Sequence, residues 1–218
     1  MSEAAWVAIG GSSGLAPRAV MPAIVRGTEL AVWRDPEGTV HAWRNQCPHR
    51  GMRLSLGFVD ENGRLACRYH GWRYGADGKC AAIPAHPDRP PPDDVSVSAY
   101  ASGERDGLIW VALSDAPPLG EIASPGEDLM FCRSLVARAG PDFVIDAAAG
   151  HVVSPGVARS ECAGAVVVLV VQPIDPGRTG IHLLAVADGI DPTTRRLEVA
   201  AWGRLLRHRI ETRVGADD

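Results

Sequence analysis

The sequence predicts an all-β N-terminal domain of antiparallel sheets followed by a small α+β domain. Three observations predict this order. Short β-rich segments separated by turn residues fill the first half, a Pro- and Gly-rich stretch interrupts the chain at 116–126, and two apolar strands followed by an amphipathic stripe fill the last third. We place the domains at 1–116 and 129–218 with a linker at 117–128. A chain of 218 residues with 46 % hydrophobic content can bury its own core.

The β-rich segments of the first domain are short and are bounded by turn signals. They cover residues 29–34, 39–44, 65–68 and 108–113. Residues 35–38, 61–63 and 76–78 carry the Gly, Asn and Asp that favour hairpins and turns. Pro-rich residues 84–92 cannot form a central strand, because Pro donates no hydrogen bond to the ladder, so we expect this loop to wrap the edge of the sheet.

The second domain begins after the linker and ends in a helix. Residues 166–172 and 181–187 are apolar strands, and 173–178 predict a strong hairpin between them. A stripe with helical spacing follows, with Asp191 or Thr193 as its cap and basic residues toward its end near Arg213. The stripe consists of Val199, Trp202, Leu206 and Ile210.

Four potential metal ligands occur in two mixed pairs in the first domain. Cys47 and His49 form a C-x-H pair, and Cys67 and His70 form a C-x2-H pair after 17 intervening residues. A Rieske-type [2Fe-2S] cluster needs this donor set, because one iron keeps two thiolates while the other takes two neutral imidazoles. Each spacing lets one tight loop deliver one thiolate and one imidazole.

The alternative is a structural zinc ion, which is also bound by two Cys and two His. Zinc fingers normally place both Cys in one pair and both His in the other, whereas each pair here is mixed. The pattern therefore favours iron and sulfide over zinc.

The residues around the quartet resemble the Rieske domain of ring-hydroxylating and demethylating oxygenases. The likeness rests on Gln-Cys-Pro-His-Arg-Gly at 46–51, Cys-Arg-Tyr-His-Gly-Trp-Arg-Tyr at 67–74, Asp-Gly-Lys-Cys at 77–80 and Ile-Pro at 83–84, and it runs from Trp6 to Val111. The resemblance implies a [2Fe-2S] cluster held at the tips of two hairpin loops.

The same resemblance indicates a subtype with a low potential. High-potential Rieske proteins carry two further Cys joined as a disulfide, and Met52 and Tyr69 occupy those positions here. They also carry a Ser that donates to a cluster sulfur, where this chain has Trp72, although Tyr74 could still donate its hydroxyl. Fewer donors stabilise the reduced cluster less, so we expect a potential near the low end of the range, about −150 mV. Such a potential suits electrons from NAD(P)H.

Charge around the quartet predicts the partner. Six arginines and only two acidic residues lie within 41–75, although the whole chain has a net charge of −4. A basic collar would steer an acidic ferredoxin or a reductase domain to the cluster. For any single arginine a solvated loop face is an equal alternative. Nucleic acid is not expected as a partner, because the rest of the chain is acidic and contains no binding motif. The six arginines within 41–75 are Arg44, Arg50, Arg53, Arg64, Arg68 and Arg73, and the two acidic residues are Asp60 and Glu61.

A catalytic iron is doubtful on sequence grounds. In the oxygenases that this chain resembles, a helix-grip α+β domain holds a mononuclear iron through two His and one carboxylate. Residues 142–146 resemble the start of that motif, but Ala149 stands where the first His is expected and only His151 is nearby. The second domain has about half the family's usual length. A triad of His151, His182 and an Asp is the alternative.

The leading functional hypothesis is a Rieske-type oxidoreductase component with a truncated helix-grip domain. It would pass single electrons from a ferredoxin or NAD(P)H-dependent reductase to a mononuclear iron in a partner chain or in a neighbouring copy, so we expect an oligomer. The first alternative is a complete small aromatic-ring hydroxylase or demethylase with a non-standard triad. The second is a redox-sensing or regulatory subunit. Oxygenase activity of the isolated chain is doubtful.

The sequence also predicts the compartment. The start of the chain lacks the basic and apolar regions of a secretory signal, and its longest apolar run, 165–171, is too short to span a bilayer. Cys80, Cys132 and Cys162 show no disulfide spacing and are expected to be reduced thiols. We therefore expect a cytoplasmic protein with no membrane association.

Overall fold

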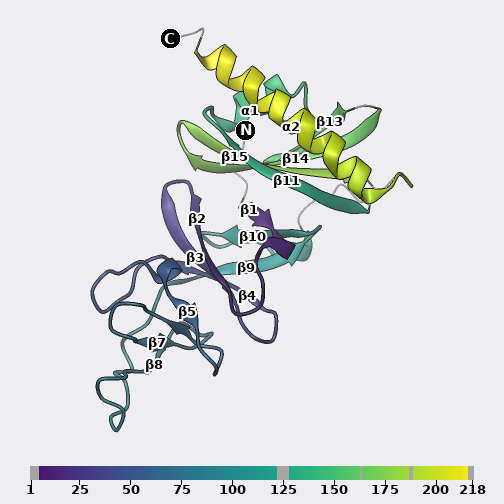
Figure 1. The fold of residues 1–218 in the computed structure, drawn as a ribbon. Coiled ribbons are helices and arrows are strands. Elements are labelled where there is room, and N and C mark those ends of the chain that lie inside the picture. The colour runs from purple at the N-terminus through teal and green to yellow at the C-terminus, as the bar shows by residue number, and fades with distance from the viewer. Residues whose placement is uncertain (1–4, 122–127, 163, 187–188, 216–218) are drawn as a thin grey trace.

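The structure, a computed structural model, describes residues 5–121, 128–162, 164–186 and 189–215. Its described strands form three antiparallel sheets of six, five and four strands. The six-stranded sheet lies between the other two, and the four-stranded sheet is at the opposite end of the molecule from the C-terminal helix (Figure 1). This arrangement confirms the predicted fold class of antiparallel sheets followed by an α+β unit.

The six-stranded sheet is the framework of the first half of the chain. Its order is β1-β10-β9-β4-β3-β2, so the N-terminal strand pairs with the last strand of this half. Two predicted strands, 29–34 and 39–44, correspond to β3 and β4, and 108–113 corresponds to β10. The bounds are β1 Trp6–Gly11, β2 Val20–Val25, β3 Thr28–Arg34, β4 Val40–Arg44, β9 Ala99–Arg105 and β10 Leu108–Ala112, with a 3-10 turn η1 at Ser12–Gly14.

The four-stranded sheet is small because loops take up most of its residues. The predicted strand 65–68 ends at Ala66, since Cys67 already begins a turn. Residues 84–92 contain no strand, as their prolines predicted. The bounds are β5 Phe58–Val59, β6 Leu65–Ala66, β7 Arg73–Tyr74 and β8 Cys80–Ala82, preceded by a 3-10 turn η2 at Leu54–Leu56.

The five-stranded sheet has the order β11-β15-β14-β13-β12 and carries both α-helices. The predicted hairpin between the two apolar strands is confirmed, but its turn is shorter than 173–178: β14 continues to Asp175 and pairs with Arg178, which leaves two residues in the turn. The elements are η3 Leu119–Glu121, β11 Leu129–Ala137, α1 Pro141–Ala147, β12 His151–Ser154, β13 Val157–Cys162, β14 Ala165–Asp175, β15 Arg178–Val186 and α2 Pro192–Val214. Most of the predicted linker, 122–127, and Ala187 lie outside the described residues.

Helix α2 covers the outer face of this sheet (Figure 1). Of the two predicted caps, Asp191 is the one used: its Oδ2 accepts a hydrogen bond from the Thr194 amide at 2.8 Å. Three residues of the predicted stripe, Val199, Leu206 and Ile210, are fully buried against the sheet, and Trp202 is partly buried. Neither helix in the described ranges has the length and apolar composition needed to cross a membrane.

Strand β14 is apolar from Val167 to Val171, where both of its faces are buried. Val167, Leu169 and Val171 face the helices, whereas Val168 and Val170 pack against the six-stranded sheet. On that side they meet Trp6, Ala8, Leu108 and Trp110 from β1 and β10. The two sheets therefore share one apolar interface.

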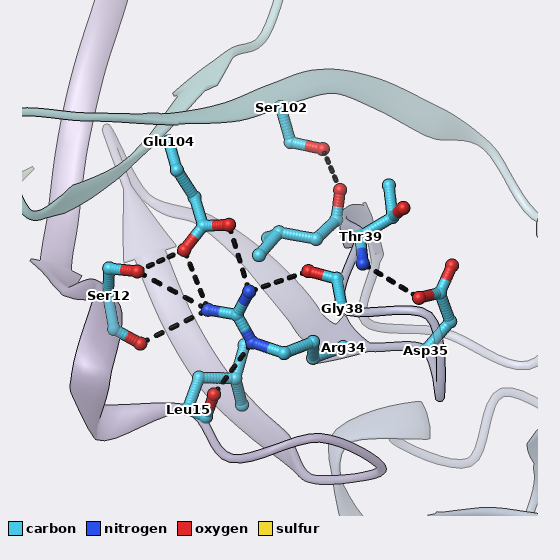
Figure 2. Close-up of polar contacts among 9 residues, drawn as sticks. Ser12, Leu15, Arg34, Asp35, Gly38, Thr39, Ser102 and Glu104 are labelled. Carbon is cyan, nitrogen blue, oxygen red and sulfur yellow. Dashed lines mark hydrogen bonds and ion pairs between the residues drawn. The ribbon is translucent and has the colours of Figure 1, made fainter.

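Arg34, at the end of β3, links this strand to β9 and to the turn η1. Its guanidinium, only 9 % exposed, donates to both carboxylate oxygens of Glu104 at 2.7 and 2.8 Å and to backbone carbonyls of Ser12, Leu15 and Gly38 (Figure 2). The Glu104 partner raises the pKa of Arg34, and Arg34 lowers the pKa of Glu104. Because β3 and β9 are distant in the sequence, this partly buried pair fixes a tertiary contact between them.

His182 on β15 links the two large sheets by hydrogen bonds. Its Nδ1 accepts from the Ser134 hydroxyl at 2.8 Å, and its Nε2 lies 3.2 Å from both the Ala8 carbonyl and Gln172 Oε1. The Gln172 amide in turn donates to the Ile24 carbonyl at 2.8 Å. Burial lowers the pKa of His182 from 6.5 to about 4, so the ring is neutral near pH 7.

This buried histidine should make folding stability depend on pH. The unfolded state binds a proton below pH 6.5, while the folded state resists protonation down to about pH 4. Stability present above pH 6.5 should therefore fall by about 3 kcal/mol as the pH drops to 4. The free energy of unfolding, measured with urea at pH 7 and pH 4.5, should decrease less in His182→Gln than in the wild type. Equal losses in the two proteins would contradict a neutral buried His182.

Candidate metal centre

The four predicted ligands lie in two loops that have the same backbone design. In the first loop the Cys47 amide donates to the Met52 carbonyl and the Gly51 amide donates to the Cys47 carbonyl, both at 2.8 Å. In the second loop Cys67 pairs in the same two ways with Trp72 and Gly71, at 2.8 and 3.0 Å. Each loop is thus a closed turn that begins at its cysteine.

A glycine in the left-handed region closes each loop. Gly51 has φ 71° and Gly71 has φ 73°, a conformation that residues with a Cβ rarely adopt. A Cβ at Gly71 would also lie 3.0 Å from Pro84, the first residue of the Pro-rich segment. That segment therefore supports the second loop directly, a role more specific than the predicted wrapping of a sheet edge.

The loops separate the thiols from the imidazoles. The two cysteines are each 2 % exposed, and the neighbouring Cys47 adds to the burial that raises the pKa of the Cys67 thiol. The rings of His49 and His70 are adjacent, with centroids 4.7 Å apart, and they lie toward the surface. A buried thiol pair beside an outer imidazole pair fits a cluster in which one iron takes the sulfurs and the other takes the nitrogens.

Electrostatics suits metal binding at these positions. Burial raises the pKa of the Cys67 thiol, so a thiolate there needs the charge of a bound metal. Desolvation, with smaller effects of His70 and Arg50, lowers the pKa of His49 and favours the neutral imidazole that a metal requires. Among the residues that the structure describes, no three His, Cys, Asp or Glu side chains gather around a single point as a mononuclear site would need.

Aromatic side chains of the second loop cover both imidazoles. Trp72 stacks on His49, with ring centroids 4.3 Å apart and an angle of 8° between the ring planes. The ring centroids of Tyr69 and His70 are 3.9 Å apart. Sequence reasoning noted both residues only as replacements for a Ser and a Cys. Their contact with the ligand rings is a tertiary feature, although three aromatic residues within 69–74 were a signal that could have suggested it.

Tyr74 is the residue that the sequence indicated as a possible hydrogen-bond donor to sulfur. Its hydroxyl lies 3.1 Å from Cys47 Sγ and is fully buried on β7. Burial, then the neighbouring Cys47, raises the pKa of Tyr74, so the hydroxyl keeps its proton. It can therefore donate to a thiolate at this position.

Removing this hydroxyl should lower the reduction potential of the cluster. A reduced cluster carries more negative charge on sulfur, so the Tyr74 hydrogen bond stabilises the reduced form more than the oxidised form. We expect Tyr74→Phe to lower the potential by about 50 mV, which for one electron corresponds to about 1 kcal/mol. A spectroelectrochemical titration measures this, with Tyr100→Phe on β9 as the matched control. An unchanged or higher potential would contradict the donor role.

The predicted basic collar is only partly available to a partner. Arg53 forms a bidentate pair with Glu29 at 2.6 and 2.7 Å, and Arg64 and Arg73 both lie near Asp60. Two carboxylates therefore offset part of the charge of these three arginines. The sequence could not show this, because Glu29 reaches the first loop only in the folded chain. The remaining three, Arg44, Arg50 and Arg68, are exposed and have no ion-pair partner among the described residues.

The structure does not bring the alternative iron triad together. His182 lies on β15 and His151 on β12, three strand spacings apart, or roughly 14 Å. His182 is buried and hydrogen-bonded on the face toward Ala8, whereas His151 is exposed at the far edge. The two imidazoles therefore cannot share one metal ion in this fold.

Comparison with known proteins identifies the class of the first domain. Residues 5–100 match the Rieske [2Fe-2S] domain family. Oxidoreductase NdmD of Pseudomonas putida is 40 % identical over 150 residues, which are 68 % of this chain and 25 % of the relative. The 3-chlorobenzoate-3,4-dioxygenase oxygenase subunit of Comamonas testosteroni is 37 % identical over 100 residues, 45 % of this chain and 23 % of the relative. This chain thus spans about a quarter of the length of these relatives.

Solved structures show the same fold over nearly the whole chain. A crystal structure of dicamba monooxygenase superposes with a TM-score of 0.75 and 19 % identity, covering 98 % of this chain and 88 % of that one. NdmA of Pseudomonas putida CBB5 gives a TM-score of 0.70 with 21 % identity, covering 95 % and 79 %.

The chain therefore carries a Rieske [2Fe-2S] domain, and its homologues are Rieske non-haem iron oxygenases and demethylases. Its cofactor is a [2Fe-2S] cluster. At the level that these likenesses support, the domain is of a kind that occurs in oxidoreductases and oxygenases.

Proposed function

We propose that this chain is a one-electron relay that takes electrons from a ferredoxin or an NAD(P)H-dependent reductase and passes them to a mononuclear iron in a partner chain or neighbouring copy. The observation that carries the proposal is the pair of matched loops, which bury both cysteines and present both imidazoles toward the surface. When bound through Cys47, His49, Cys67 and His70, the cluster supplies a site that accepts and releases one electron.

The protein's own residues suit each part of this role. Tyr74 can stabilise negative charge on Cys47, and the aromatic rings of Trp72 and Tyr69 fix the positions of the imidazoles. Arg50 and Arg68 follow a ligand directly in each loop and have charges available for an acidic partner. Together they favour electron exchange at an exposed, positively charged surface.

The structure favours the relay over a complete oxygenase. The separation of His151 from His182 leaves the chain without the triad that the alternative requires, so the acceptor iron would belong to another polypeptide. The change of sheet between β10 and β11 supports the proposed division into 1–116, 117–128 and 129–218. The described cysteines are free thiols, which suits the cytoplasm as the proposed compartment.

Docking of an acidic electron donor tests this proposal. Reduced plant-type ferredoxin has a potential near −400 mV and can reduce a cluster near −150 mV. In stopped-flow experiments at low salt, Arg50→Gln/Arg68→Gln should slow this reduction by about tenfold, and high salt should slow the wild type similarly. Arg196→Gln/Arg204→Gln on α2, at the far end of the molecule, is the control with the same loss of charge (Figure 1).

Two results would contradict the relay. One is a rate that is equal in both double variants and insensitive to salt. The other is oxidation of an aromatic substrate by the isolated chain supplied with Fe(II), O2 and reductase.

A further inference from the structure

An arginine follows each ligand loop and pairs with a carboxylate from outside the loop. In both loops the residue whose carbonyl accepts the cysteine amide is followed at once by an arginine, Arg53 in the first loop and Arg73 in the second. Arg53 pairs with Glu29 on β3, and Arg73 pairs with Asp60 immediately after β5. The two loops therefore share an outside support as well as a backbone design.

Glu29 holds the first loop on both of its sides. Its backbone carbonyl accepts the Asn45 amide at 3.0 Å just before the loop, and its carboxylate accepts two hydrogen bonds from Arg53, at 2.6 and 2.7 Å, just after the loop. Asn45 is only 6 % exposed, and its side-chain oxygen accepts the Ser55 amide at 2.8 Å. A paired guanidinium and carboxylate fix direction as well as distance. The loop that carries His49 is thus held from one residue of β3.

The backbone of Glu29 is itself fixed by its neighbours. The turn between β2 and β3 donates two hydrogen bonds to the C-terminal unit, from the Arg26 amide to the Pro173 carbonyl and from the Gly27 amide to the Ile174 carbonyl, both at 2.7 Å. Strand β3 is also paired on both sides, with β2 and with β4. The Glu29 carboxylate therefore extends toward the first loop from a rigid part of the fold.

Asp60 gives the second loop a corresponding support. The residue is buried, and its Oδ1 accepts the amides of Asn62 and Arg64, both at 2.9 Å. Its Oδ2 lies 3.2 Å from Arg64 Nε and 3.5 Å from Arg73 Nε. A buried carboxylate between two guanidinium groups has few alternative positions, because leaving them would leave its charge unpaired. Arg73, directly after the second loop, is thereby held in place.

We propose that Glu29 and Asp60 are positioning residues for the cluster. Each carboxylate acts through the arginine that follows one loop, and it fixes that loop and the orientation of the imidazole that the loop presents to iron. Groups outside the ligand set that orient the ligands also tune the metal, so the loss of either pair should change the spectrum of the cluster. The inference rests on the cluster and not on the proposed relay, so its failure would leave the relay standing.

Electron paramagnetic resonance of the reduced, cluster-loaded protein tests the first pair. Glu29→Gln and Arg53→Gln should each widen the spread of g values, because the first loop then takes several positions. Each should also speed the loss of iron to a chelator about threefold, the size expected for an exposed ion pair. The charge-swapped variant Glu29→Arg/Arg53→Glu should restore the narrow spectrum and the slow loss. Glu37→Gln, an exposed carboxylate in the turn between β3 and β4, is the matched control and should change neither.

Asp60→Asn tests the second pair. The amide keeps an oxygen that can accept the Asn62 and Arg64 amides, but it lacks the charge that holds Arg73. The variant should widen the spread of g values and speed the loss of iron about tenfold. This effect is larger than that of Glu29→Gln because the Asp60 carboxylate is buried between its partners.

Arg53→Lys separates positioning from charge. It keeps the positive charge but lacks the paired N–H donors, so it should widen the spread of g values as Arg53→Gln does. If charge alone mattered, Arg53→Lys would match the wild type, and Glu29→Gln and Arg53→Gln would shift the reduction potential in opposite directions with narrow spectra. That pattern would overturn the proposal, as would a charge-swapped variant whose spectrum stays as broad as those of the single variants.

Discussion

Cys67→Ala should abolish cluster binding and destabilise the first domain. Cys67 supplies one of only two thiolates, and a ligand that binds only the folded state contributes its binding energy to folding. The visible absorbance of the purified protein should disappear, and the small sheet, β5 to β8, should lose stability on the order of several kcal/mol. Absorbance spectra with iron and sulfide analysis measure the first effect, and urea unfolding measures the second.

Cys80→Ala is the matched control for this change. Cys80 is also a buried thiol in the same apolar cluster as Cys67, and its Sγ lies 3.9 Å from the Ala82 carbonyl. Its burial raises its thiol pKa as it does for Cys67. If Cys80→Ala lost the cluster as completely as Cys67→Ala, the ligand assignment would be wrong.

His70→Cys should keep a cluster but lower its potential strongly. A thiolate adds negative charge where a neutral imidazole stood, so adding an electron becomes less favourable. Because clusters with four thiolates lie near −400 mV, we expect a decrease of about 200 mV or more from the low end of the Rieske range. The g values of the reduced protein should shift in the same variant, since one nitrogen ligand has been replaced by sulfur.

His86→Cys is the control for that experiment. His86 is exposed in the Pro-rich segment, so the same substitution there should leave the potential of the cluster unchanged. A rise in potential in His70→Cys with an intact cluster would mean that His70 is not a ligand.

The sequence could predict the features that depend on local chemistry. The ligand spacing, the turn residues and the helical stripe on α2 are local patterns, and the structure has the expected loops, strands and helix at those positions. Asp191 was one of two caps that the sequence allowed, and only the geometry of its carboxylate with the Thr194 amide distinguishes it.

Features that depend on distant residues could not be predicted. Glu29 neutralises Arg53 across 24 residues, and Asp60 is shared by two arginines, so the basic collar is smaller than its composition indicated. The bonds of His182 to Ala8 and Gln172 likewise join residues that no short motif relates.

The most direct test of the central claim is the iron, acid-labile sulfide and zinc content of the purified chain, measured per polypeptide. An electron relay with one Rieske cluster and no iron triad predicts two irons, two sulfides and no zinc. Three irons per chain would restore the complete oxygenase, and stoichiometric zinc without sulfide would contradict the cluster itself.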